Sequence, residues 1–341
     1  MAGSPTHLRR SRHLAAGLLL LALLLVMVAL LSLAVGARPI PLGEVIDGLL
    51  NPALDTTNAT IMRDLRVPRT LLGLLVGAAI GLAGAIMQGV TRNPLADPGL
   101  LGIDAGAALL VVVGISVFGL TALTSYVWLA FLGAGVATAL VYAVASLGRE
   151  GATPVKLALA GAAVTAAFGS VTTGILMTNA QTLDAFRFWQ VGSLAGRNTE
   201  ILFGVAPFLA VGIVLALVTG RLLDAMALGD DIARGLGQRV MLSRGVAAVT
   251  WIILAGGATA AAGPIGFVGL TVPHAARAIT GPSYRWILPY SALLAPTLLL
   301  GADIVGRVLA PPGELQVGIV TAALGAPLFI ALVRRRRLAE L

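Results

Sequence analysis

The chain contains at least seven apolar runs of about 20 residues each without a charged side chain, and that is the length a helix needs to cross a bilayer. The runs are continuously apolar and do not alternate with polar residues, which excludes a porin-type barrel. Only 11% of the 341 residues are charged, whereas a soluble chain carries roughly a quarter. The sequence therefore predicts an all-α polytopic membrane protein with a single transmembrane domain over residues 1–341.

The boundaries of the apolar runs predict about ten transmembrane helices. The first run, Leu14 to Val35, lacks a convincing cleavage site and is interpreted as a retained helix, with a cleaved signal peptide as the alternative. The charge-free stretch from Ala105 to Gly148 is too long for one span and is expected to hold two helices, with a turn near Thr121 to Ser125. Further spans are expected at 70–89, 157–177, 201–219, 287–302 and 317–333, and on either side of a broken segment, 263–273, that is rich in glycine and proline.

Ten spans place both termini on one side of the membrane. With cytoplasmic termini, 16 of the 23 lysine and arginine residues fall on the inner side and seven on the outer side, which agrees with the excess of basic residues in cytoplasmic loops. This arrangement leaves Arg63, Arg66 and Arg69 outside, where the same tendency disfavours them. We interpret this basic stripe as a docking site for an acidic partner. Residues 181–198 combine aromatic residues with two arginines, which is typical of an interfacial helix on the outer side.

Several kinds of chemistry are absent from the sequence. There is no cysteine, hence no disulfide, no thiolate metal site and no thiol redox chemistry, and the three histidines show no metal-ligand spacing. The only lysine, Lys156, does not follow a glycine-rich phosphate-binding loop, and the dispersed arginines do not indicate nucleic acid. Asp104 and Asp303 are expected near the ends of spans, which is unfavourable for a proton relay. The chain is therefore expected to bind no cofactor and to catalyse no reaction, so that any pumping depends on another subunit.

The polar stretch 221–244 is expected to form a cytoplasmic loop that contacts such a subunit. Met226, Leu228, Ile232 and Leu236 are spaced like one apolar face of a short helix and are flanked by charged residues. A short amphipathic helix can insert into a groove of a partner protein. The alternative is a helix that lies on the membrane surface.

Five segments are specific enough in combination to indicate a family. They read RVPRTLLGLLVGAAIGLAGAIMQGVTRNPLADPGLLGIDAGA, ALGDDIARGLG, GPIGFVGLTVPHAAR, GADIVGR and GIVTAALGAPLFIALV. The chain resembles the FecCD family of ABC-transporter permeases from about Leu42 to Arg335. That family imports iron chelates, haem and cobalamin. The resemblance implies the type II, BtuC-like importer fold in a bacterial cytoplasmic membrane.

The resemblance also implies roles for individual residues. Arg66, Arg69 and Arg307 would hold acidic residues on the two lobes of a substrate-binding protein. Asn93 and Leu95 would belong to an inner gate. A second gate would lie at 153–156, where this chain has Pro154 and Val155 in place of the small hydroxyl residues common in relatives. Contact with the ATPase, which binds ATP and magnesium, would come from the coupling-loop residues Leu228, Gly229, Asp230, Ala233, Leu236 and Gly237.

The segments FRFWQVGSLAGRN, R-W-x-L-P at 285–289 and PGEL at 312–315 look most similar to ferric-enterobactin permeases. The expected cargo is therefore a ferric siderophore of catecholate type, with haem second and cobalamin third. Two different permeases are expected to pair around the pathway, with a homodimer as the alternative. An ion-coupled secondary transporter is a remote alternative, because it should carry an ionisable residue inside the membrane.

Overall fold

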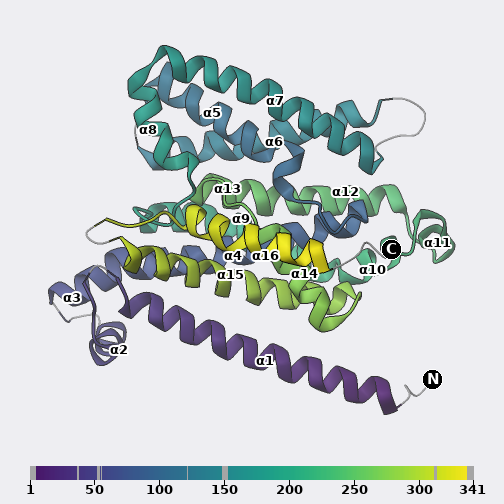
Figure 1. The fold of residues 1–341 in the computed structure, drawn as a ribbon, viewed down its shortest axis with the longest axis horizontal. Coiled ribbons are helices and arrows are strands. Elements are labelled where there is room, and N and C mark those ends of the chain that lie inside the picture. The colour runs from purple at the N-terminus through teal and green to yellow at the C-terminus, as the bar shows by residue number, and fades with distance from the viewer. Residues whose placement is uncertain are drawn as a thin grey trace.

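A computed structural model describes residues 5–36, 38–51, 54, 56–120, 122–147, 153–310 and 313–335, and all regular structure in these ranges is helical (Figure 1). Seven of its helical segments are long and apolar enough to cross a membrane, and two shorter apolar helices accompany them. The helices are α1 (Pro5–Ala34), α2 (Leu42–Leu50), α3 (Thr57–Thr60), α4 (Val67–Thr91), α5 (Ile103–Phe118), α6 (Leu123–Ala145), α7 (Pro154–Thr178), α8 (Ala180–Gln190), α9 (Thr199–Val218), α10 (Gly220–Ala227), α11 (Asp230–Gly235), α12 (Val240–Trp251), α13 (Gly257–Ala262), α14 (Val268–Thr280), α15 (Tyr284–Leu309) and α16 (Val317–Arg335). The prediction of an all-α membrane protein is confirmed.

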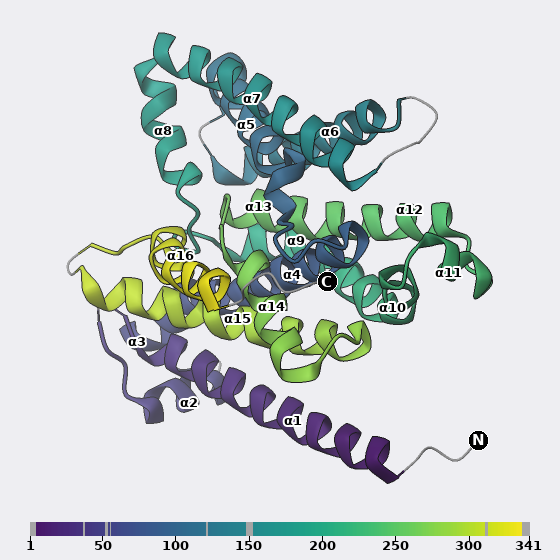
Figure 2. The ribbon, with the colours of Figure 1, turned by 45° about the vertical axis from the view of Figure 1, so that its right-hand side comes forward.

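Helix α4 lies at the centre of the bundle, between α15, α14 and α9 (Figures 1 and 2). Its glycines allow the neighbouring backbones to come close. A Cβ on Gly77 would overlap the backbone of Pro296 in α15, and one on Gly84 would overlap the backbone oxygen of Gly269 in α14. Because small residues let membrane helices approach each other closely, the glycine-rich face predicts this packing, and the structure shows it.

Helices α5, α6, α7 and α8 form a second group beside this centre (Figures 1 and 2). The backbones of α5 and α6 touch where Gly106 faces Gly133. Helix α1 packs along α15 and otherwise presents exposed leucines, as expected for a helix whose remaining surface contacts lipid. The two ends of the bundle are named here by their short helices. The α2 end carries α2, α3 and α8, and the α11 end carries α10 and α11 (Figure 1).

The helix that contains α4 begins earlier than the apolar run indicates. The segment 57–66, expected as part of an outer loop, is helical and continues directly into α4, with a π-helical turn at Ile61–Arg66. Pro68 explains why the turn is irregular, because it has no N–H to donate to the carbonyl four residues earlier. The arginine stripe therefore lies on a helix and not in a loop.

The broken segment near residue 263 is confirmed. A π-helical turn at Ile252–Gly256 joins α12 to α13, and the chain then leaves the helix at Gly263, which has a φ of 76°. The break packs on the α8–α9 connection, where the amide of Ser193 donates to the carbonyl of Ala262 at 2.7 Å. Non-helical backbone at membrane depth is tolerated where other protein surrounds it, and this contact provides such surroundings.

Helix α1 begins, and α16 ends, toward the α11 end of the bundle (Figure 1). This agrees with the expectation that both termini lie on one side. Pro312, the first residue of the PGEL segment, and the arginines at 336 and 337 lie outside the described residues.

Candidate functional site

Two of the three arginines of the expected docking site, Arg66 and Arg307, cap the end of α1. Arg66 donates from Nη1 to the carbonyls of Leu33 (2.7 Å) and Ala34 (2.8 Å), and its Nη2 donates to the carbonyl of Arg38. Arg307 donates to the carbonyls of Ser32 (2.8 Å) and Val35 (2.9 Å). The last carbonyls of a helix have no partner within the helix, and cationic groups stabilise that end. The two guanidinium groups therefore fasten α1 to α4 and α15.

The third arginine belongs to an ion-pair network around Asp303. Arg69 donates to both carboxylate oxygens of Asp303, from Nη2 at 2.8 Å and from Nε at 3.1 Å. Arg307 reaches the same carboxylate at 2.7 Å, and Nη1 of Arg69 also pairs with Glu314 at 2.7 Å. Asp303 is thus the shared counter-ion of two arginines at the α2 end.

This geometry changes the docking prediction. Arg66 is 7% exposed and Arg307 3% exposed, and the Nη1 and Nη2 atoms of both donate to groups of this chain. A partner's carboxylate cannot reach either of them in this conformation. Arg69 has a 12% exposed side chain and shares its outer nitrogen with the more exposed Glu314. Docking of a substrate-binding protein on all three arginines stays a prediction. Arg69 is the one of the three that a partner protein can reach most directly.

The coupling loop forms two short helices at the α11 end. Leu228 and Leu236 are exposed there, while Gly229 (φ 109°) and Gly237 (φ 82°) provide the backbone turns. Asp230, at the start of α11, pairs with Arg244 at 2.8 Å and with Arg92 at the end of α4. Asp230 therefore ties the loop to the helix that forms the centre of the bundle.

Two residues of the loop are placed differently from the expectation. Ala233 is 0% exposed, so it packs inside the loop and cannot contact a partner in this conformation. Met226 is also buried, whereas Ile232 is exposed. The expected single apolar face is divided in this way because a turn at Gly229 separates α10 from α11.

The two expected gate segments line one cavity of about 390 Å³ at the α11 end. Asn93 and Val155 both contribute to its wall, together with Met87 from α4. The side chain of Asn93 accepts a hydrogen bond from the amide of Leu95 at 2.9 Å, which holds the turn after α4, and Leu95 itself is exposed. The gate function remains a prediction, but the two segments lie close together in the fold.

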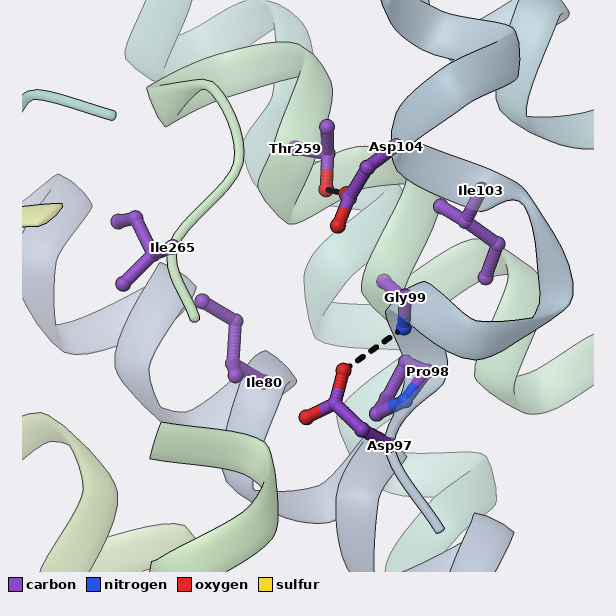
Figure 3. A pocket seen from close by; sticks show the side chains of 9 residues that line it. Ile80, Asp97, Pro98, Gly99, Ile103, Asp104, Thr259 and Ile265 are labelled. Carbon is purple, nitrogen blue, oxygen red and sulfur yellow. Dashed lines mark hydrogen bonds between the residues drawn. The ribbon is translucent and has the colours of Figure 1, made fainter. Parts of the chain in front are cut away.

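Two acidic side chains that the sequence does not indicate as a site lie close together in the fold. The sequence does not show this because the path of the chain after α4 is not apparent from it. Asp97 and Asp104 face a small cavity of about 20 Å³ lined by Ile80, from the middle of α4, and Thr259 of α13 (Figure 3). Asp97 accepts the amide of Gly99, and Asp104 accepts the hydroxyl of Thr259, both at 2.9 Å. Asp104 lies in the first turn of α5, at the end of a helix as expected, but this end of α5 lies beside the middle of α4 and not at the surface of the bundle. The absence of a buried acid is no longer an argument against ion-coupled transport.

Comparisons with known proteins add independent information. A profile of the FecCD transport family matches residues 23–335. The chain is 45% identical over 317 residues to the ferric enterobactin transport system permease protein FepD of Escherichia coli (strain K12), covering 93% of this chain and 94% of FepD. It is 37% identical to the hemin transport system permease protein HmuU of Yersinia pestis, covering 93% and 95% of the two chains. A solved structure described as an inward-facing conformation of a metal-chelate type ABC transporter superposes with a TM-score of 0.82 at 29% identity, covering 94% of this chain and all of that one.

Proposed function

This chain belongs to the FecCD transport family, and from this premise we propose that it is the permease subunit of an importer for ferric siderophores of the catecholate type. Permeases of this family are transport subunits of iron-siderophore and haem importers and are not enzymes, and they work with an ATPase and a binding protein. The chain is a multi-pass membrane protein homologous to bacterial inner-membrane permeases. The observation that carries the choice of cargo is the 45% identity to a ferric enterobactin permease over 93% of the chain.

Haem is the second candidate, because a hemin permease is 37% identical over a similar share of the chain. Uptake by proteoliposomes that contain the complete transporter separates the candidates. Labelled ferric catecholate, haem and cobalamin are offered in parallel, with binding protein outside. We expect uptake of the ferric catecholate alone. Uptake of haem or cobalamin in its place would contradict the choice of cargo and leave the permease assignment intact.

We place the α11 end in the cytoplasm and the α2 end outside. Among the described residues, more lysines and arginines lie at the α11 end, Arg221, Arg239 and Arg285 among them, than at the α2 end, and an excess of basic residues is typical of cytoplasmic faces. The ATPase, which carries ATP and magnesium, then meets the exposed leucines of α10 and α11. The permease itself binds no cofactor.

The exposed coupling-loop leucines supply a first prediction. Replacing Leu236 with serine is expected to lower uptake about tenfold or more, because an apolar side chain at the centre of an interface carries much of its binding energy. Binding-protein docking should stay unchanged. Uptake and ATP hydrolysis are measured together, with Leu147→Ser as a control at another exposed position of the same end. Equal behaviour of the two variants would contradict the assigned ATPase contact.

A second prediction concerns docking at the outer end. Glu314 pairs with Arg69 in this structure. We propose that a carboxylate of the binding protein takes the place of Glu314 on Arg69 during docking. Glu314→Gln should then strengthen docking by up to about fivefold, because a partly exposed ion pair of at most ~1 kcal/mol no longer competes. Arg69→Gln should weaken docking. Affinity for the binding protein is measured by surface plasmon resonance. A loss of affinity in both variants would indicate a general defect of the α2 end and contradict the exchange.

The second permease would pack against α7. One face of this helix exposes small or hydroxyl-bearing side chains, among them Ala163, Ala166, Ser170 and Thr173, and such residues allow membrane helices to associate closely. A heterodimer with the pathway between two such faces is our preference, with a homodimer as the alternative.

The cargo would enter from the binding protein, and ATP binding by the partner subunits would move α10 and α11. Through Asp230 and Arg92 this motion would reach α4 and the gates.

A further inference from the structure

Another cavity, of about 320 Å³, lies at the α2 end and has no role in the function described so far. Its wall comes from the start of α6, from α8, from the α8–α9 connection and from the residue before α16. The larger side chains among its lining residues, which a ligand would contact, are Tyr126, Phe188, Trp189, Arg197 and Gln316. The volume lies within the range of pockets that bind small molecules.

Arg197 makes this cavity unusual. It is 8% exposed, and its only hydrogen bond within the described residues runs from Nε to the carbonyl of Ser193 at 3.2 Å. No carboxylate of the described residues pairs with it, in contrast to Arg69 and Arg307, which share Asp303. Burial lowers the pKa of Arg197 to about 10, partly offset by Tyr126, so the side chain stays protonated at neutral pH. Buried charges in proteins are normally paired, and this one lacks a counter-ion where it faces a cavity.

Three aromatic residues line the same cavity. They are Tyr126 of α6 and Phe188 and Trp189 of α8. The indole Nε1–H of Trp189 finds no acceptor among the described residues. The guanidinium group of Arg187 lies 5.0 Å from the centre of the Phe188 ring, but it pairs with Asp184 at 3.1 Å and does not line the cavity. A ligand that fits must therefore combine negative charge with a flat apolar ring.

We propose that this cavity is a substrate subsite that receives an anionic aromatic arm of the iron chelate on the outer side of the permease. Arg197 pairs with the negatively charged oxygens of the arm, and the aromatic side chains pack against its ring. The subsite rests on the proposed function and gives the permease its own preference among chelates. A ferric tris-catecholate meets the requirement, and so does haem with its carboxylates, whereas a ferric trihydroxamate is electrically neutral.

Binding to the assembled transporter tests the subsite. The complex of permeases and ATPase, without binding protein, is dialysed to equilibrium against radiolabelled ferric tris-catecholate, haem or ferric trihydroxamate. For the wild type we expect the neutral ferric trihydroxamate to bind at least tenfold more weakly than whichever anion, ferric tris-catecholate or haem, binds more tightly. Arg197→Met should weaken binding of that anion by about tenfold to hundredfold, the range expected for a charge-assisted hydrogen bond. Arg197→Lys should recover part of this loss.

The matched control is Arg187→Met, which removes a nearby arginine that does not line the cavity and already has Asp184 as its counter-ion, and it should change affinity less than twofold. Equal binding of neutral and anionic chelates by the wild type would overturn the subsite, whatever the variants do. An unchanged affinity in Arg197→Met would overturn it as well. A wild-type complex that imports none of the chelates with ATP and binding protein present would instead overturn the proposed function. Tighter binding of haem than of the catecholate would keep the subsite and reassign the cargo.

Discussion

Replacing Asp303 with asparagine is expected to destabilise the permease by about 3–5 kcal/mol, the cost of leaving buried charges without their counter-ion. Asp303 is 1% exposed and receives hydrogen bonds from both Arg69 and Arg307. Asparagine keeps the shape of the side chain but turns a donor toward one of the two cations. Arg307 also holds the last carbonyls of α1, so the loss should extend to the attachment of that helix.

The free energy of unfolding in detergent measures this effect. Asp184→Asn serves as the matched control, because Asp184 pairs with Arg187 at 3.1 Å on an exposed surface. An exposed pair contributes at most about 1 kcal/mol. If the two variants lost similar, small amounts of stability, the ion-pair network at the α2 end would not hold α1, α4 and α15 together as described.

Replacing Gly84 with alanine is expected to prevent normal packing of α4 on α14. The added Cβ would overlap the backbone of Gly269, and backbone cannot move aside as the end of a flexible side chain can. Overpacking of a close contact costs about 1–3 kcal/mol or more. We expect the purified variant to unfold at a clearly lower temperature and to accumulate poorly in the membrane.

Gly135→Ala provides the contrast within the same protein. Gly135 lies in the middle of α6 and has no neighbouring atom within 4 Å of an added Cβ. Alanine is the better helix former by up to about 1 kcal/mol, so this variant should be as stable as the wild type or slightly more stable. A similar loss in both variants would show that glycine itself, and not the close approach of two helices, matters at these positions.

The spans could be predicted from the sequence because each is an uninterrupted apolar run. The ends of α6, α7 and α9 agree with the expected boundaries to within a few residues. The early start of the α4 segment could not be predicted in the same way. Its charged residues, Arg63 and Arg66, indicate a loop when they are considered alone. They are accommodated on a helix because Arg66 finds the carbonyls at the end of α1, more than 30 residues away.

Among the candidate sites, too, some could be predicted from local sequence and others depend on contacts between distant parts of the chain. The coupling loop and the gate segments have local sequence motifs, so their positions could be proposed in advance. The roles of Asp104 and Arg197 depend on what surrounds them in three dimensions. Asp104 enters the bundle only because the chain turns back after α4 (Figure 3). Arg197 is notable because no carboxylate in the described part of the chain pairs with it, and a missing counter-ion has no signature in the sequence.

Reconstituted uptake shows whether this permease imports an iron chelate with energy from a partner ATPase. Proteoliposomes carry the two permeases and the ATPase, with binding protein and labelled ferric catecholate outside and ATP inside. We predict uptake that requires both ATP and binding protein and is insensitive to the collapse of proton and sodium gradients. Uptake without ATP that follows an imposed ion gradient would contradict import driven by a partner ATPase. Asp97 and Asp104, the two acids of the small cavity, would then be the first residues to substitute.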